Sequence, residues 1–411
     1  MRISSSSMYR VPIESITRQQ TEIERTQLEI SSGIKQSELS RDPSAARQVA
    51  DLERQLADGE QFASNTDTVT SRLVTVESTL DSAVDLMQRV RELAVMSLNG
   101  SFAANQRGAV ATEVRALNDQ LLALANRRDA SGEYIFAGSV TNAAPLRRTG
   151  TGGAVEYHGD SVERTIRVDG TTTVKDGFTG QRTFMQVPKG NGYFSTAAAT
   201  ANTGTAVADA GIVTDVSTWN TNSGNYKIVF TVSGGSTNYE VRTGAGAALV
   251  PAVTGTYQTG QVISFLGAQM TIQGTPANGD EFTISPSTGT DQYQSIFATL
   301  DRQLTILETP VANSAKGAQQ STDLGNIIQQ LDQALSNLGT LRSESGARLR
   351  VVEQSSQFRD DDKLDIQQSL SDLRDIDMAE ALGRLNAQMT ALQVAQQAYA
   401  RIASRSLFDY L

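Results

Sequence analysis

The first forty residues carry a narrow apolar stripe with helical spacing. Its positions follow one another at alternating steps of three and four residues, which is the pattern of a coiled-coil seam. They are Ile13, Ile16, Gln20, Ile23, Gln27, Ile30 and Ile34. Because glutamine in a seam lowers the gain from burial, we expect this helix to need a partner before it is stable. The pattern predicts an N-terminal assembly helix in residues 1–40, with Ile13, Ile16, Ile23 and Ile30 in its interface.

The end of the chain, residues 373–411, repeats this pattern with glutamine at one seam position, Gln396. Two helices with such narrow stripes bury them best by packing on each other and on copies of the chain. We therefore predict a C-terminal assembly helix here. Its predicted interface residues are Leu382, Leu385, Met389, Leu392 and Tyr399, together with Leu407 and Phe408 in the closing sequence SLFDYL.

Helical periodicity also fills residues 41–139 and 290–372, which we predict to be the two parts of a helical rod. Asp42 is a candidate N-cap, and Pro43 follows it at the first helical position. The acidic run Asp360–Asp362 has no glycine or alternating oxygen ligands of a calcium loop, so we interpret it as a solvated linker.

The composition changes to Gly, Thr, Ser and Asn between residues 140 and 289. Short alternating runs such as YKIVFTV (226–232) and EFTIS (281–285) are separated by turn-rich spacers, which predicts an inserted β domain built as a sandwich or small barrel. Tyr134, Ile135 and Phe136 are predicted to form the first strand. The fold class is therefore α+β, a long antiparallel helical rod or coiled coil formed by both chain ends, with an inserted all-β domain.

The composition excludes several functions. The chain has no cysteine and one histidine, which rules out thiol catalysis, disulfides and zinc motifs that need two histidines. A net charge of -10 argues against nucleic-acid binding. No stretch is apolar enough for a membrane span or a cleavable signal, so we expect a soluble protein without a membrane partner.

No catalytic, cofactor or metal site is predicted. His158 precedes a turn at Gly159, and we interpret it as a surface residue at a strand end. The glycine-rich stretches lack the spacing of a phosphate-binding loop and are interpreted as turns. A carboxylate-pair glycosidase in the β insert remains as an enzymatic alternative, although no pair of carboxylates can be selected for it.

Several segments at the two ends resemble one protein family. They are MRISSSSMYR (1–10), RDPSAARQV (41–49), NQRGAVATEVRALNDQLLALANRRDASGEYIFAGS (105–139) and the last 37 residues, DIDMAEALGRLNAQMTALQVAQQAYARIASRSLFDYL. The chain resembles the bacterial flagellin superfamily, and within it the hook-associated proteins. A single acidic residue, Asp42, stands where the family often has a pair. The DDAAG-like element and leucine-rich tail typical of filament flagellins are absent, which favours a junction subunit over a filament subunit.

The resemblance implies a structural, non-enzymatic role in the bacterial flagellum. It implies a layer that joins the hook to the filament, with the preceding hook-associated protein, flagellin and copies of itself as partners. It also implies export through the flagellar type III apparatus without a cleaved signal peptide, aided by an export chaperone. Filament flagellin is the alternative within the family.

Overall fold

The computed structural model describes residues 5–35, 42–98, 104–150 and 152–403, which form two compact units. The first unit comprises Met1–Asn65, Val168–Gly170 and Gln354–Leu411. The second comprises Thr66–Arg167 and Thr171–Glu353. Each unit contains segments from both halves of the sequence.

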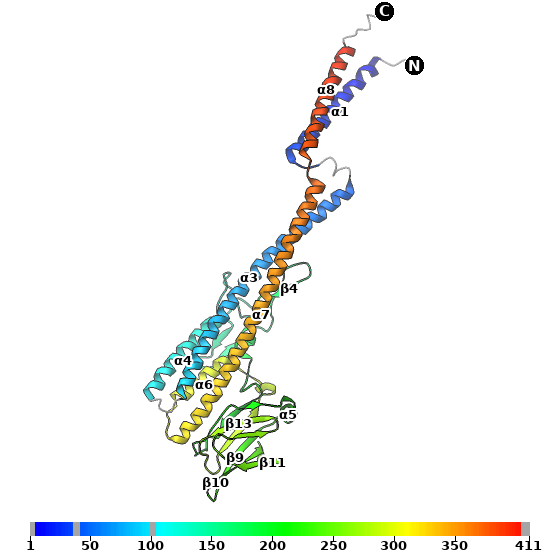
Figure 1. Cartoon of the computed structure of the whole chain (residues 1–411). Helices are drawn as coiled ribbons and strands as arrows, with labels where there is room; N and C mark the ends of the chain where they lie inside the picture. The colour runs from blue at the N-terminus through cyan, green and yellow to red at the C-terminus, as the bar shows by residue number, and fades with distance from the viewer. Residues whose placement is uncertain (1–4, 36–41, 99–103, 151, 404–411) are drawn as a thin grey trace, which may run out of the picture. The chain divides into compact units, whose positions relative to one another are not determined.

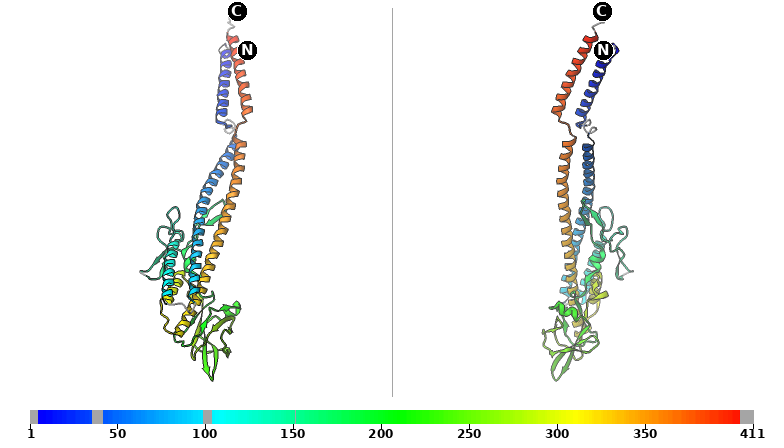
Figure 2. Two further views of the ribbon diagram at one scale, coloured as in Figure 1. Left: turned by 60° about the vertical axis from the view of Figure 1, so that its left-hand side comes forward. Right: turned by 90° about the vertical axis from the view of Figure 1, so that its right-hand side faces the viewer.

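The first unit pairs the two ends of the chain. Helices α1 (Ser5–Ser32) and α8 (Met378–Ala403) lie side by side and antiparallel, as the views in Figures 1 and 2 agree. The hydroxyl of Thr26 donates a hydrogen bond of 2.9 Å to Gln388 across the pair. Just after the end of α1 and just before the start of α8, the backbone N–H of Ile376 donates to the carbonyl of Gly33 at 2.9 Å. The predicted pairing of the chain ends is confirmed.

Helix α3 (Pro43–Ser97) begins as predicted. The carboxylate of Asp42 accepts hydrogen bonds from the backbone N–H groups of Ser44 at 2.8 Å and Ala45 at 3.2 Å, which satisfies two donors that lack a partner inside the helix. Pro43 is the first helical residue, where its missing N–H costs nothing.

The prediction of a linker at Asp360–Asp362 is wrong. Helix α7 (Ser314–Arg374) runs through all three residues, and all three are exposed on its surface. Aspartate is a poor helix former, but its cost per residue is well under 1 kcal/mol and does not end a long, packed helix. The break comes instead at Asp375–Asp377, where the carboxylate of Asp377 caps α8 by accepting from the backbone N–H of Ala379 at 2.9 Å.

The second unit has a helical core formed by α3, α4 (Ala104–Ala125), α6 (Ile296–Glu308) and α7. The stripe residues Leu80, Met87 and Leu121 are fully buried in it. The beginning of the predicted β insert belongs to this same core, because Phe136 and Phe184 lie edge to face at 5.1 Å among the helices.

Tyr134–Phe136 is not a strand, contrary to the prediction. Ile135 and Phe136 are both buried, whereas neighbouring residues of a strand point to opposite faces. The segment turns at Gly138, whose positive φ of 76° favours glycine. Between this turn and the β lobe lie short elements: β1 (Leu146–Arg148), β2 (Val155–Tyr157), β3 (Thr165–Arg167), β4 (Thr173–Lys175), the π-helical turn η1 (Gln181–Met185) and β5 (Val187–Pro188).

Residues 194–286 form a separate β lobe with its own core. One antiparallel sheet has the strand order β11-β10-β9-β14-β6, and a second has the order β12-β13-β7 with β8 also paired to β13. The elements are β6 (Phe194–Ala198), β7 (Val207–Ala208), β8 (Ile212–Val213), α5 (Val216–Thr221), β9 (Tyr226–Ser233), β10 (Ser236–Thr243), β11 (Ala248–Thr256), β12 (Val262–Phe265), β13 (Ala268–Gln273) and β14 (Glu281–Pro286). Residues of both sheets share one buried core with Trp219, so of the two predicted forms, a sandwich or a small barrel, the lobe is a sandwich of two sheets. The 3-10 turn η2 (Gly289–Asp291) and β15 (Tyr293–Gln294) lead back to α6.

A row of polar side chains on α7 bonds the main chain of the lobe and of the segment that precedes it. Asn326 donates to the carbonyl of Thr196 in edge strand β6 at 2.8 Å and accepts from the Thr196 hydroxyl at 2.7 Å. Gln319 donates to the carbonyl of Ala199 at 3.2 Å. The row, called the amide row below, also includes Thr322, whose hydroxyl accepts from the backbone N–H of Ala208 in the lobe. Its members Gln330 and Asn337 bond backbone groups of the segment before the lobe, at Pro188, Gly190 and Thr183. The row covers a sheet edge that would otherwise expose unpaired backbone groups.

Replacing Asn326 by leucine should loosen the lobe without unfolding it. The substitution leaves the carbonyl of the buried Thr196 without its partner, at a cost of about 1–3 kcal/mol. We expect faster amide hydrogen exchange in β6, while the fluorescence of Trp219 still reports a folded lobe core. Gln367→Leu, at an exposed position of the same helix, is the control and should change neither signal. Unchanged exchange in β6 would show that the amide row does not hold the lobe.

Candidate assembly interface

The paired terminal helices bring together half of the predicted interface residues. On α1, Ile23 is buried and Ile16 and Ile30 are half-buried, all on the side that faces α8. On α8, Leu385, Leu392 and Tyr399 are half-buried in the same way. These two sets are spaced by seven residues, so each helix presents one residue every two turns to the other. Leu407 and Phe408 lie outside the residues that the structure describes.

At other positions of the two helices, the residue that is buried lies one position before the residue that was predicted. The buried residues here are Thr26 (3% exposed) and Glu29 (5%) on α1 and Ala381 (0%) on α8, rather than Gln27, Ile30 and Leu382. In a helix, residues three and four positions along lie on either side of the same face, so the isoleucine spacing alone does not decide between them. Thr26 and Ala381 are too small or too polar to stand out in a hydrophobic pattern, and the sequence gives no other signal for them.

Several apolar side chains of the pair remain exposed within one chain. Ile13 is 47% exposed, Leu382 46% and Met389 52%, although each was predicted to lie in the interface. Val11, Leu28 and Val394 are exposed as well. Exposed apolar residues concentrated on one helix pair are typical of a surface that another protein covers.

Two grooves lie beside α8. Their volumes are about 730 Å³ and 530 Å³, and they share Asn386 and Thr390 as lining residues. The first is otherwise lined by Gln19, Ala387, Ala391, Val394 and Ala395, and the second by Ile23, Gln27, Met389, Leu392, Gln393 and Gln396. The first groove is lined mainly by small and apolar residues, which suits the side chains of another helix better than it suits a charged ligand.

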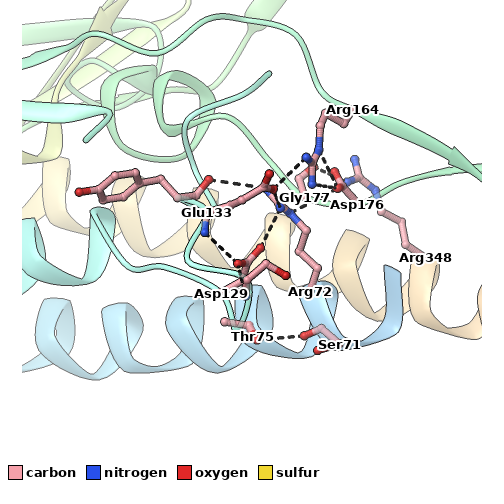
Figure 3. Close-up of polar contacts among 11 residues, drawn as sticks. Ser71, Arg72, Thr75, Asp129, Glu133, Arg164, Asp176, Gly177 and Arg348 are labelled. Atoms are coloured by element: carbon pink, nitrogen blue, oxygen red, sulfur yellow. Dashed lines mark hydrogen bonds and ion pairs between the residues drawn. The ribbon is translucent and has the colours of Figure 1, made fainter. Parts of the chain in front are cut away.

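The helical core of the second unit is fastened by a cluster of arginines and carboxylates (Figure 3). Arg72 on α3 is 5% exposed and pairs with Asp129 and Glu133 at 2.9 Å each and with Asp176 at 3.3 Å. Arg164 pairs with Glu133 at 2.9 Å and with Asp176 at 2.7 Å. The cluster therefore ties the loop after α4 and the loop after β4 to α3.

A neighbouring cluster ties the same region to α7. Glu163 pairs with Lys175 at 2.8 Å, Arg182 at 3.2 Å and Arg348 at 3.4 Å. Arg348 also donates to the carbonyl of Gly177 at 2.7 Å. The carboxylates of both clusters are fixed by ion pairs with arginines, an arrangement that holds segments of the chain together.

Opposing effects set the pKa values of these carboxylates. Burial by itself would raise the pKa of Glu163, but the hydrogen bonds from Lys175 and Arg182 and the charge of Arg348 hold that pKa below its ordinary value. Burial would also raise the pKa of Glu133, but the hydrogen bond from Arg72 and the charge of Arg164 outweigh it, so this pKa is likewise lowered. In the folded protein these groups bind protons less readily than in the unfolded chain.

This difference predicts a loss of stability in acid. A lowered pKa contributes stability that is complete above the unfolded value of about 4.3 and is lost as the pH falls through the folded value. The urea midpoint of the helical core should therefore fall between about pH 5 and pH 3. Glu163→Gln should be less stable at neutral pH but lose less on acidification. An equal loss in the variant and the unchanged protein would contradict this assignment.

The structure gives no support for a metal site or a membrane span in the part of the chain it describes. No group of three or more histidine, cysteine or acidic side chains is arranged to hold a metal ion among these residues. None of the helices in the described ranges is both long enough and apolar enough to cross a bilayer. His158 is exposed next to β2, as expected.

Comparison with protein families accounts for both helical ends and for the lobe. The bacterial flagellin N-terminal helical region matches residues 3–141, and the bacterial flagellin C-terminal helical region matches residues 327–411. These ranges contain α1 and α8. Residues 197–286 match the D2-like domain of flagellar hook-associated protein 1.

Individual proteins are similar over different shares of their length. Flagellar hook-associated protein 3 of Salmonella typhimurium is 35% identical over 46% of this chain, and the match spans 58% of that protein. The protein of the same name from Escherichia coli is 25% identical over 100% of this chain and 99% of its own length. The flagellar junction protein FlgL from Legionella pneumophila is 31% identical, with a TM-score of 0.71 over 80% of this chain and 100% of that structure.

Proposed function

The chain belongs to the bacterial flagellin family, and from this premise we propose that it is a structural subunit of the flagellum that joins the hook to the filament. Its relatives over nearly their whole length are hook-associated protein 3 and a junction protein, which favours this role over that of filament flagellin. The helical ends matched by the family are the ends that pair in the structure.

The exposed surface of the terminal helix pair is the observation that carries the proposal. Ile13, Leu382 and Met389 remain exposed after α1 and α8 have packed together. Covering this surface removes apolar area from water at about 25 cal/mol for each Å², a gain that is available only in an assembly. These three residues would lie between copies of the chain, whereas Ile16, Ile23, Ile30, Leu385, Leu392 and Tyr399 would hold each pair together.

The proposed partners are the hook-associated protein that precedes this chain in the structure of the flagellum, flagellin, and copies of the chain itself. We propose that the chain works outside the cell and reaches that site through the flagellar type III apparatus, unfolded and accompanied by an export chaperone. The role is structural and involves no catalysis.

The alternative, a filament flagellin, is tested with the purified chain. A filament subunit should grow long fibres on seeds in moderate salt, whereas a junction subunit stops after a layer. We expect electron microscopy to show no long fibres. Adding flagellin to hooks that carry this chain should start filament growth, and hooks without it should stay bare. Long fibres of the chain alone would overturn the junction role in favour of the filament.

A further inference from the structure

The middle of α6 contains a glutamine in an apolar environment. Gln303 is 0% exposed, and the neighbouring helix positions Leu300, Leu304 and Leu307 belong to the core of the second unit. Neither the Nε2 nor the Oε1 atom of Gln303 has a hydrogen-bond partner among the residues that the structure describes. It is therefore a buried amide whose two donors and carbonyl oxygen are unpaired within the described protein.

Such an arrangement weakens a core. A primary amide forms hydrogen bonds to water in the unfolded chain and loses them on burial, so an unpaired one opposes folding. Most buried polar groups in folded proteins are paired, and each exception calls for an explanation. Leucine, the commonest residue on the buried side of this helix, would fill a similar volume without this cost.

A second buried glutamine in the same unit shows the usual arrangement. Gln330 on α7 is 4% exposed, and both ends of its amide are used. Its Nε2 atom donates to the carbonyl of Pro188 at 2.8 Å, and its Oε1 atom accepts from the backbone N–H of Gly190 at 2.8 Å. The fold therefore pairs a buried glutamine where the glutamine fastens a loop, and leaves one unpaired in the centre of α6.

We propose that Gln303 is a built-in weak point that lowers the resistance of the helical core to unfolding. The benefit rests on the proposed function, in which the chain must pass unfolded through an export channel before it folds in place. A core of uninterrupted leucine packing would unfold more slowly and delay that passage. The two glutamines allow the idea to be tested by one chemical change made at two sites.

The experiment compares Gln303→Leu with Gln330→Leu in the full chain. Thermal and urea unfolding are followed by far-ultraviolet circular dichroism, with Trp219 fluorescence as a separate signal for the β lobe. We expect Gln303→Leu to raise the midpoint of the helical transition by about 2–6 °C and to slow unfolding roughly tenfold. Gln330→Leu should shift the midpoint downwards, because it leaves Pro188 and Gly190 unpaired. Gln303→Met, which is unbranched like glutamine, repeats the test with a different shape.

A midpoint that is unchanged or lower in both Gln303 variants overturns the proposal, since it would mean that the amide contributes to stability. Secretion into the medium then tests the benefit in cells. Gln303→Leu should be secreted at least about twofold more slowly than the unchanged chain if unfolding limits passage, and secretion at the same rate would overturn the link to export. Failure of the proposed function is a different result, in which the unchanged chain itself is not secreted.

Discussion

A chain carrying Leu392→Pro is expected to remain folded in its second unit but to lose assembly. Proline in the interior of α8 removes the hydrogen bond to the carbonyl of Gln388 and clashes with it, at a cost of about 3 kcal/mol or more. Gln388 also accepts the hydrogen bond from Thr26, so the contact between the two chain ends is lost at the same level. A cost of this size lowers the population of the assembled state roughly a hundredfold. The measurement is the fraction of hooks that acquire this subunit, counted by electron microscopy.

The control is a substitution of similar energetic cost in the β lobe. Trp219 on α5 is buried in the core of the lobe, and Trp219→Ala should cost about 3–5 kcal/mol within the lobe. Assembly should nevertheless be kept, because the proposed interface lies on α1 and α8, whereas the damage is confined to the lobe, residues 194–286. If Leu392→Pro assembled normally, the paired helices would not be the interface. If the Trp219 variant had intact helices but failed to assemble, the lobe would be part of the joint.

The second large effect is expected at Arg72. Arg72→Leu keeps an apolar side chain in place but leaves Asp129, Glu133 and Asp176 without the guanidinium that all three contact. Glu133 and Asp176 keep Arg164, but Asp129 (12% exposed) loses the charge it pairs with, and Asp176 (4% exposed) loses one of two guanidinium groups. Removing one partner of a buried ion pair typically costs about 3–5 kcal/mol, and we expect a loss of this size in the urea unfolding of the helical core.

Arg302→Leu is the matched control. Arg302 also pairs with a carboxylate, that of Asp323 at 3.0 Å, but its side chain is 48% exposed. Exposed pairs contribute about 0–1 kcal/mol, so the urea midpoint should hardly move. Equal effects of the two substitutions would show that the Arg72 cluster does not fasten the core.

The terminal helices were predictable in their type and pairing but not in every contact. Repetition of apolar residues every seven positions identified Ile16, Ile23, Leu385 and Leu392 on the contact side. It could not identify Ala381, because a small residue leaves no mark in a hydrophobic pattern. Which of two adjacent positions faces the partner is decided by the side from which the partner approaches, and this is a property of the pair rather than of either helix.

The β region was predictable where strands alternate and not where the chain turns. The runs at Tyr226–Ser233 and Glu281–Pro286 form neighbouring strands of one sheet. The strand predicted at Tyr134–Phe136 was wrong because this segment is a turn whose apolar residues, Ile135 and Phe136, are buried in the helical core. The division of residues 140–289 between two cores is not visible in composition, since both parts are rich in the same turn residues.

The charged clusters and the amide row could not be foreseen. Arg72 is 57 residues from Asp129 and 61 residues from Glu133 in the sequence, and only the folded chain brings them together. Glutamine and asparagine on α7 look like ordinary surface residues, because the sequence does not show that a sheet edge lies against them. Local pattern predicts elements well, whereas contacts between polar groups depend on the complete fold.

The junction role is tested most directly by deleting the gene in its host and examining both the cells and the medium. The account predicts cells with bare hooks and with flagellin shed into the medium as monomer, because flagellin would have no layer on which to seat. Restoring the unchanged gene should restore filaments. Filaments of normal length on the deleted cells would contradict the account, and cells that make hooks but no flagellin at all would identify the chain as the filament subunit instead.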